Sequence, residues 1–247
     1  MDKHNSQKNF FLDLFFPKFC LGCQKEGLYL CDDCRAILDI SEYDFCLCSK
    51  NPIRTPGTQG KCPRCQHKKL SGLYSALPYK EKHLTKKLIY QFKYKPYLKD
   101  LAETLANIII EHLILSQKNT NEIWAPNGMP AILIPVPISK EKLKDRGYNQ
   151  SEEMAKELSK VLKIPAVFDV LIKTKNTKPQ MELSQREREK NLFDAFSAKN
   201  AEKIADRKVF LVDDVYTTGS TMEECARVLK KAGAKEIWGI TLARESL

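Results

Sequence analysis

The sequence predicts an α/β protein in which a small cysteine-rich module precedes a domain built on a parallel sheet. From about residue 71 onwards, apolar runs suited to strands alternate with amphipathic stretches suited to helices, as is typical of parallel sheets with helical crossovers. Eight of the nine cysteines lie earlier, between Cys20 and Cys65. We therefore expect a cysteine-rich module at 1–70 and a sheet domain at 71–247.

The sheet domain is expected to begin with a strand and two helices. Residues 73–77 are apolar enough to form a strand. Apolar side chains at helical spacing over 84–92 predict a helix that ends before Pro96, because proline disrupts a helix interior. Further apolar positions from 98 to 113 predict a second helix.

The middle of the domain begins with AILIPVPI at 131–138, a continuous apolar run suited to a strand buried on both faces. We expect a helix over 151–162 and a strand over 167–172. The polar stretch 174–191 has no apolar period and is expected to be a long loop with at most a short helix.

The C-terminal part of the domain has the clearest pattern. Residues 208–212 predict a strand, and 220–232 predict a helix closed by Gly233. A last strand is expected at 237–242. These elements place a strand-to-helix turn directly after the apolar run that ends at Val212.

The net charge of the chain indicates the class of its partners. Lys and Arg number 41 against 31 Asp and Glu, and the resulting net charge of +10 favours polyanions such as nucleic acid, anionic lipid or phosphorylated ligands. A lysine-rich surface without such a partner is the ordinary alternative.

No apolar run is long enough to cross a bilayer, and Asp13 and Lys18 interrupt the apolar N-terminal stretch. We expect a cytoplasmic protein.

The stretch 209–221 reads VFLVDDVYTTGST and predicts a sugar-phosphate site. In a parallel sheet, ligands bind beyond the carboxyl ends of the strands, where adjacent carboxylates can accept hydrogen bonds from vicinal ribose hydroxyls. Small and hydroxyl-bearing residues at a helix N-terminus suit a phosphate. A capped helix without a ligand is the alternative, but one such residue would suffice for a cap. The residues assigned to this site are Asp213, Asp214, Val215, Tyr216, Thr217, Thr218, Gly219, Ser220 and Thr221.

This stretch resembles the loop that binds phosphoribosyl pyrophosphate (PRPP) in type I phosphoribosyltransferases, although Tyr216 is bulkier than the aliphatic residue usual there. Four further segments extend the resemblance: LIPVPIS, DRGYNQSEEMAKEL, REREKNLFDAF and AGAKEIWGITLAR, at 133–139, 145–158, 186–196 and 232–244. Together with the cysteine module, they are similar to the ComF family of competence proteins. The similarity covers nearly the whole chain.

The resemblance implies a type I phosphoribosyltransferase fold that binds PRPP with Mg²⁺. It implies that Asp213 and Asp214 contact the ribose hydroxyls, directly or through Mg²⁺, and that 217–221 hold the 5′-phosphate. It also implies a role in natural transformation, in which the protein handles single-stranded DNA after uptake. The implied pyrophosphate-side residues are Pro137, Ser139, Lys140 and Arg146, and those of a mobile closing loop are Gln180, Arg186, Arg188 and Asn191.

Whether this pocket is catalytic or regulatory stays open at this point. In phosphoribosyl transfer, carboxylates near the ring and cations near the leaving group would stabilise an oxocarbenium-like transition state. However, only five residues follow the last predicted strand, and no general base is evident. The alternatives are a phosphoribosyltransferase that acts on an amine or base, unrelated to DNA, and a scaffold that senses nucleotide supply and recruits partner proteins.

The cysteines have the spacing of zinc ligands. Four thiolates suit a tetrahedral zinc ion, and a structural zinc can stabilise a module too small to do so by burial. The one-residue gap between Cys46 and Cys48 departs from the usual two. Interleaved pairing, with Cys20 and Cys23 sharing an ion with that pair, is an alternative, as are free or redox-active cysteines. The expected quartets of this zinc-ribbon module are Cys20, Cys23, Cys31 and Cys34, and Cys46, Cys48, Cys62 and Cys65.

Residues 64–99 form a basic segment with interleaved aromatic rings. This segment contains ten lysines and arginines and a single acid, Glu81. Lysines that follow a phosphate backbone and rings that stack on bases are typical of single-stranded DNA binding. The alternative is an amphipathic helix whose rings, such as Tyr90 and Phe92, pack inward. The lysines assigned to DNA are Lys80, Lys82, Lys86, Lys87, Lys93 and Lys95.

The N-terminal stretch is rich in large apolar residues. They would suit insertion into a membrane surface beside a DNA-uptake channel, or docking on the body of the protein. The first alternative adds peripheral association with the inner membrane, where DNA-uptake or recombination proteins would be partners. The residues concerned are Phe10, Phe11, Leu14, Phe15 and Phe19.

Overall fold

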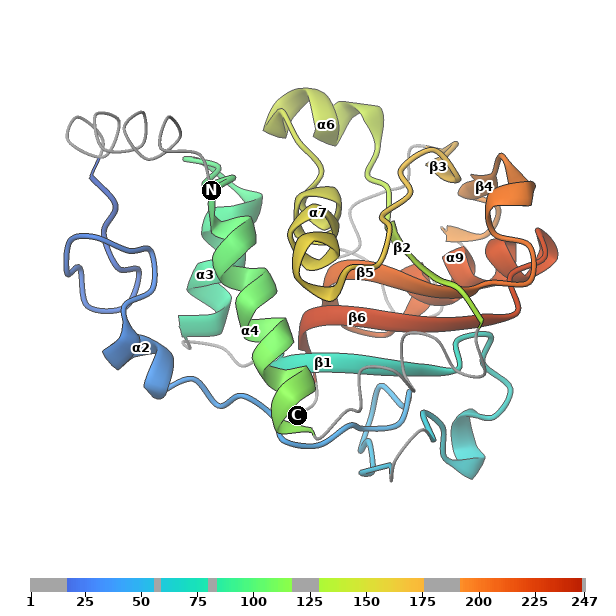
Figure 1. Ribbon diagram of the computed structural model, residues 1–247, viewed down its shortest axis with the longest axis horizontal. Coiled ribbons are helices and arrows are strands. Elements are labelled where there is room, and N and C mark those ends of the chain that lie inside the picture. The colour runs from blue at the N-terminus through green and yellow to red at the C-terminus, as the bar shows by residue number, and fades with distance from the viewer. Residues whose placement is uncertain (1–16, 56–58, 80–83, 117–128, 176–191, 246–247) are drawn as a thin grey trace.

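The centre of the computed structural model is a sheet of four parallel strands, which confirms the predicted fold class (Figure 1). Its two middle strands are almost entirely buried, as expected for apolar runs covered on both faces. The strands lie in the order β1 (Gly72–Pro78), β6 (Glu236–Arg244), β5 (Lys208–Tyr216) and β2 (Ala131–Pro135).

Several predicted positions lie outside the described residues. Those outside are Phe10, Phe11, Leu14, Phe15, Lys80 and Lys82, together with the whole predicted closing loop of Gln180, Arg186, Arg188 and Asn191. The structure describes residues 17–55, 59–79, 84–116, 129–175 and 192–245.

Three helices cover one face of the sheet: α3 (Leu84–Lys93), α4 (Leu101–Leu115) and α7 (Gln150–Leu162). Their apolar faces join one buried cluster that includes Phe92 and Phe210. The predicted helices are confirmed because the residues at helical spacing, such as Leu88, are the ones that lie in this cluster.

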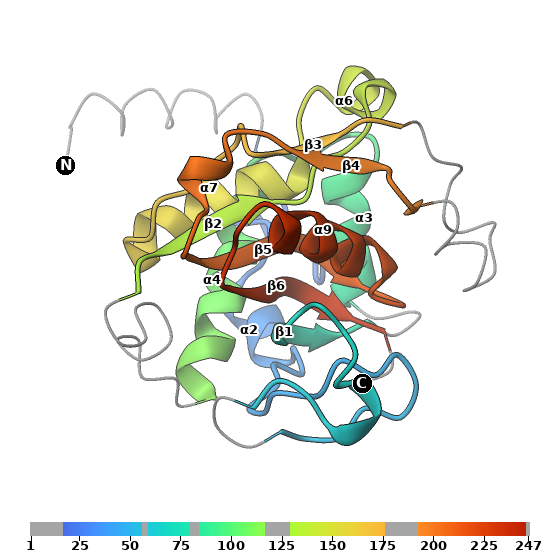
Figure 2. The same cartoon turned by 90° about the vertical axis from the view of Figure 1, so that its right-hand side faces the viewer.

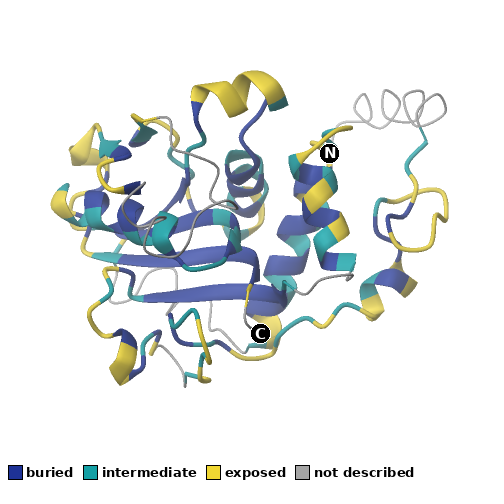
Figure 3. Cartoon of the chain, turned by 180° about the vertical axis from the view of Figure 1, so that it is seen from behind, coloured by how far each residue is buried: buried dark blue, intermediate teal, exposed yellow. Residues whose placement is uncertain are grey.

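The opposite face carries α9 (Ser220–Lys231) and a small antiparallel pair, β3 (Leu171–Lys173) and β4 (Phe196–Ala198) (Figure 2). The short helix α6 (Lys140–Arg146) stands above the body of the protein. Its residues are largely exposed, whereas the sheet is buried (Figure 3, where α6 is uppermost). The remaining short elements are α2 (Asp32–Ala36) and two 3₁₀ turns at Pro63–Cys65 and Ala201–Lys203.

The observed strand boundaries correct three predictions. β5 was expected to end at Val212 but continues to Tyr216, because β6 runs alongside it as far as Arg244. The strand expected over 167–172 is reduced to β3, since the backbone from Pro165 to Val167 instead bonds to Leu133 of β2. β2 itself ends at Pro135 rather than at residue 138.

The cysteine-rich part of the chain packs on two different parts of the protein. Cys20, Cys31 and Cys34 belong to the cluster beside α3 and α4, whereas Cys46 and Cys62 belong to the cluster on the α9 face. The segment between these two groups passes beneath β1 in Figure 1 and lies alongside that strand. The amide of Ser41 donates a hydrogen bond of 2.8 Å to the carbonyl of Ala76 on β1.

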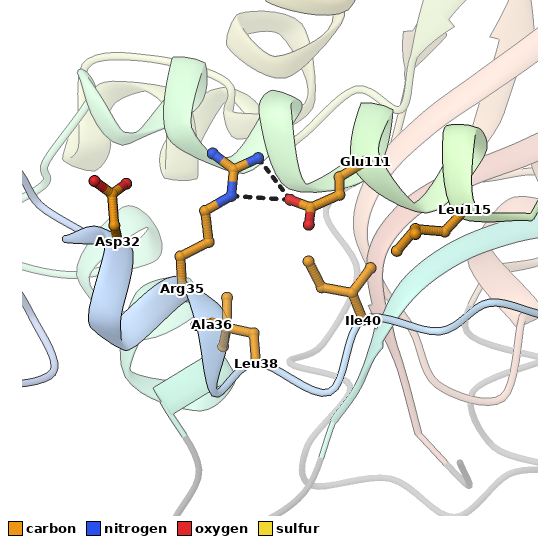
Figure 4. A pocket seen from close by; sticks show the side chains of 7 residues that line it. All are labelled: Asp32, Arg35, Ala36, Leu38, Ile40, Glu111 and Leu115. Carbon is orange, nitrogen blue, oxygen red and sulfur yellow. Dashed lines mark hydrogen bonds and ion pairs between the residues drawn. The ribbon is translucent and has the colours of Figure 1, made fainter.

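An ion pair joins α2 to α4. Nε and Nη2 of Arg35 donate to Oε2 of Glu111 at 2.9 and 2.6 Å, beside a hollow of about 300 Å³ between the two helices (Figure 4). Both side chains are more than a third exposed, so solvent screens the pair. The contact orients α2 on α4 more than it stabilises the fold.

Within the described residues, no helix combines the length and the apolar character needed to cross a membrane.

Candidate functional site

Asp213 and Asp214 lie near the carboxyl end of β5, at the edge of the sheet where ligands bind in this fold class. Oδ1 of Asp213 accepts two hydrogen bonds of 2.9 Å, from the Ser151 hydroxyl at the start of α7 and from the Asp214 amide. Nζ of Lys93, the last residue of α3, lies 2.9 Å from Oδ1 of Asp214. Three elements therefore converge on the paired acids.

Lys93, which was assigned to DNA, contacts the paired acids, and this contact was not predicted from the sequence. Its side chain is 24% exposed and points to Asp214. Burial disfavours its ammonium, but Asp214 and Asp213 outweigh this effect and raise the pKa of Lys93. A signal was present in the sequence: Lys93 follows Ile89 by four residues, so helical spacing puts it on the buried side of α3.

Burial and the neighbouring Asp214 carboxylate raise the pKa of Asp213 to about 7, although Lys93 opposes the shift. A carboxyl whose pKa is raised on folding holds a proton that the unfolded chain has released. The folded state therefore binds more protons between about pH 4, the ordinary value for Asp, and about pH 7. Over this window the Asp213 contribution to stability falls as the pH rises.

We expect Asp213→Asn to gain stability relative to wild type as the pH is raised from about 5 to about 8, because asparagine mimics the protonated carboxyl. Denaturant unfolding of both proteins at each pH measures this difference. Asp169→Asn is the control: Asp169 is exposed, and Lys203 lowers its pKa, so its effect should not change over this range. A pH-independent difference for Asp213→Asn would contradict the prediction.

The loop 217–219 leads from β5 into α9, and the predicted hydroxyls lie on this loop and on the first two residues of α9. Gly219 adopts a φ of 80° as the N-cap of α9, and no side chain caps that helix. The hydroxyls of Thr218 and Ser220 lie 2.8 Å apart, and the Ser220 amide donates to Oγ1 of Thr218 at 3.3 Å. Gly219, rather than a Ser or Thr, is therefore the N-cap of α9.

The corner between β2 and α6 lies beside the acids, because β2 is the neighbour of β5 and the Val136 amide donates to the Val212 carbonyl at 2.9 Å. Ser139 is the N-cap of α6, and its hydroxyl accepts from the Lys142 amide at 3.4 Å. Of the other predicted pyrophosphate-side residues, Pro137 is half-buried and Lys140 is exposed. Arg146 donates to Oε1 of Gln150 at 2.9 Å, and its guanidinium lies 5.5 Å from the centre of the Tyr94 ring.

The cysteines form the two consecutive quartets, and the interleaved pairing is wrong. In each quartet the four sulfurs lie within 4.8 Å of one another, and all nine cysteines are free of disulfides. Sγ of Cys48 lies 3.6 Å from that of Cys62, and Sγ of Cys23 lies 3.5 Å from that of Cys31. A tetrahedral zinc ion with Zn–S bonds of about 2.3 Å would hold its sulfurs about 3.8 Å apart, so both quartets fit zinc.

The outer face of α3 is basic and aromatic. Lys87, Tyr90 and Tyr94 are exposed at helical spacing, and the two tyrosine rings lie 4.9 Å apart. Phe92 is fully buried and Tyr90 is 54% exposed, so the alternative in which the rings of this helix pack inward holds for Phe92 and fails for Tyr90. Of the remaining lysines assigned to DNA, Lys86 is half-buried and Lys95 is exposed.

A family model described as the phosphoribosyl transferase domain matches residues 149–246, which span α7, both acids and the loop that follows. Together with the parallel sheet, this match confirms the predicted phosphoribosyltransferase fold. The match begins after β2, so the corner that precedes α7 lies outside it.

Three curated proteins illustrate what larger or smaller parts of the chain are similar to. Competence protein F of Haemophilus influenzae is 36% identical over 159 residues, which cover 63% of this chain and 67% of that protein. The DNA utilization protein YhgH of Escherichia coli is 27% identical over 227 residues, covering 85% of this chain and 95% of the relative. Competence protein ComFC of Bacillus subtilis is 33% identical over 115 residues, covering 46% and 44% of the two chains.

Proposed function

The chain belongs to the ComF family of competence proteins, and from that membership and the geometry of the site we propose that it binds PRPP and single-stranded DNA during DNA utilisation. In this proposal the protein acts in the cytoplasm. The two cysteine quartets hold structural zinc ions. The partners at the DNA-uptake machinery are the proteins that deliver or receive the single strand.

One observation carries the PRPP proposal: adjacent acids, of which Asp214 is buried, and a hydroxyl-lined loop at a helix N-terminus lie near the end of the same strand. Asp213 and Asp214 offer the oxygen ligands that both ribose hydroxyls and Mg²⁺ prefer. The loop 217–221 offers backbone amides and hydroxyls to the 5′-phosphate. Lys93 and the β2–α6 corner provide cationic and polar groups for the pyrophosphate.

Calorimetric titration of PRPP with Mg²⁺ into the wild type and the double variant Asp213→Ala with Asp214→Ala tests this proposal. We expect binding by the wild type and at least a 100-fold loss in the variant, because both contacts to the sugar disappear. The matched control is Asp32→Ala with Asp33→Ala, which removes an exposed adjacent pair of aspartates on α2 and should leave the affinity unchanged. Equal affinities in all three proteins would contradict the proposal.

Turnover is a second candidate function, which the ion pair of Lys93 with Asp214 beside the sugar site favours. The Lys93 ammonium would stabilise charge that develops as pyrophosphate leaves. Pyrophosphate release from PRPP, assayed with bases, amines and nucleic-acid ends as acceptors, tests this function. If the wild type releases no more pyrophosphate than the double aspartate variant, PRPP binding without turnover is the function that remains.

The DNA proposal rests on the exposed face of α3. Tyr90 and Tyr94 present neighbouring rings on which bases can stack, and Lys87 lies one helical turn before Tyr90. Stacking on rings and attraction to the phosphate backbone do not require a particular sequence. The same face adjoins Arg146, so the cationic surface continues toward the β2–α6 corner.

Fluorescence anisotropy with a labelled oligonucleotide of mixed sequence tests this surface. The logarithm of the affinity should fall with the logarithm of the salt concentration, with a slope of about −0.7 for each phosphate contacted. Lys86→Glu with Lys87→Glu should weaken binding at low salt and reduce that slope. Lys231→Glu with Lys235→Glu makes the same charge change at the far end of α9 and should have a smaller effect. Failure of the wild type to bind at low salt would overturn the DNA proposal.

A further inference from the structure

The turn that carries Cys46 and Cys48 of the second quartet contacts Tyr216, the residue directly before the phosphate loop, 217–221. Tyr216, which immediately precedes the loop, is 1% exposed. Its hydroxyl donates a hydrogen bond of 3.0 Å to the carbonyl of Leu47, the single residue between Cys46 and Cys48. The bulky residue that distinguishes this loop therefore reaches the middle of a metal-ligand pair.

Lys68 binds both partners of this hydrogen bond. It follows Cys65 by three residues, and its ammonium donates to the Leu47 carbonyl at 2.6 Å and to the Tyr216 hydroxyl at 3.1 Å. The hydroxyl thus both donates and accepts. A hydroxyl with two such partners has a defined position, which fixes the ring that lies behind the loop.

Arg244 ties the ends of β5 and β6 to the same cysteine pair. It pairs in register with Tyr216, is 1% exposed, and lies with its guanidinium 5.4 Å from the Tyr216 ring centre. Nη1 and Nη2 donate to the carbonyls of Cys46 and Cys48 at 3.1 and 2.8 Å. All three carbonyls from Cys46 to Cys48 therefore bind side chains at the C-terminal ends of the two central strands.

A second attachment, made by hydrogen bonds, holds the chain on the C-terminal side of the loop. The carboxylate of Glu223, in the first turn of α9, accepts hydrogen bonds from the amides of Lys69 and Leu70, which follow the quartet in the chain. Between the two attachments, Gly219 lies against the Tyr216 ring so closely that a Cβ added there would come within 2.2 Å of the hydroxyl. The loop is held on both sides.

We propose that Tyr216 is a positioning residue, through which the metal-bound second quartet sets the shape of the phosphate loop. The proposal rests on the proposed binding of a 5′-phosphate by this loop. Zinc at the quartet would fix the Cys46–Cys48 turn, the turn would fix the Leu47 carbonyl, and that carbonyl with Lys68 would fix the hydroxyl beneath Gly219. The first quartet lies against α3 and has no part in this arrangement.

Hydrogen exchange of the full-length protein, followed in a peptide covering 216–222, tests the arrangement without any ligand. We expect faster exchange in Tyr216→Phe and in Cys48→Ser. The controls are Tyr74→Phe, another buried tyrosine of the sheet, and Cys23→Ser in the first quartet, and both should leave this peptide as in wild type. Tyr216→Phe should retain its zinc, so it carries the test even if Cys48→Ser folds poorly.

Titration with PRPP and Mg²⁺ adds the functional readout. Loss of the two hydrogen bonds of the Tyr216 hydroxyl predicts about 3- to 10-fold weaker binding in Tyr216→Phe, with no change in Tyr74→Phe. Wild-type exchange and affinity in Tyr216→Phe, or equal loosening by Cys23→Ser and Cys48→Ser, would overturn the proposal. If wild type does not bind PRPP but the exchange contrast is present, the proposed ligand is wrong and the positioning role stands.

Discussion

Replacing Cys31 with serine is expected to remove one zinc ion per chain and to lower the free energy of unfolding by about 3 kcal/mol or more. A structural zinc supplies on the order of 10 kcal/mol of folding free energy, and serine is a poor ligand for it. Cys31 also belongs to the buried cluster that contains Leu88 and Phe92 of α3. Loss of the ion should therefore loosen the packing of α3 as well as the module.

Metal analysis of the purified protein, combined with denaturant unfolding, measures both effects. The wild type should carry two zinc ions and Cys31→Ser one. Cys225→Ala is the matched control, because Cys225 is fully buried in the core but belongs to neither quartet. It should retain both ions. A wild type without metal, or a Cys31→Ser variant that keeps both ions, would contradict the zinc assignment.

Gly219→Ala is expected to lower the free energy of unfolding by about 2–4 kcal/mol and to abolish PRPP binding. A φ of 80° costs a non-glycine residue about 1 kcal/mol. The added Cβ would also lie 2.2 Å from the Tyr216 hydroxyl and 2.4 Å from the ring carbon that bears it. The ring is held by Leu47 and Lys68, so it cannot move aside without breaking buried hydrogen bonds.

Gly147→Ala separates the conformational cost of the positive φ from the cost of the clash with Tyr216. Gly147 has nearly the same φ, 77°, but a Cβ added there meets nothing within 4 Å. This variant should therefore show only the conformational cost of about 1 kcal/mol. Thermal or denaturant unfolding of both variants gives the comparison. Equal losses of stability would mean that the contact with Tyr216 contributes nothing.

The elements with a strong local pattern were predictable from the sequence. The run 208–212, the helical spacing of 84–92 and the cysteine pairs each specify their structure over a few neighbouring residues. The acids were placed near the carboxyl end of a buried strand by the same logic, although β5 continues two residues beyond Asp214.

The elements without such a pattern were missed for physical reasons. α6 buries none of its residues, so it leaves no apolar period, and β4 has only three residues. The pairing of Lys93 with Asp214 and the contact of Tyr216 with Leu47, 169 positions apart, depend on how distant elements pack. No local pattern encodes contacts of that kind.

The segment that lies alongside β1 has a consequence for how the protein avoids aggregation. β1 is the outermost strand on its side of the sheet, and an uncovered outer strand is a template for pairing with another molecule. The chain near Ser41 covers this strand, and the Ser41 amide donates a hydrogen bond to the Ala76 carbonyl. A version cut down to 71–247 would expose that strand, so it should form intermolecular β-structure even though every residue of its sheet is still present.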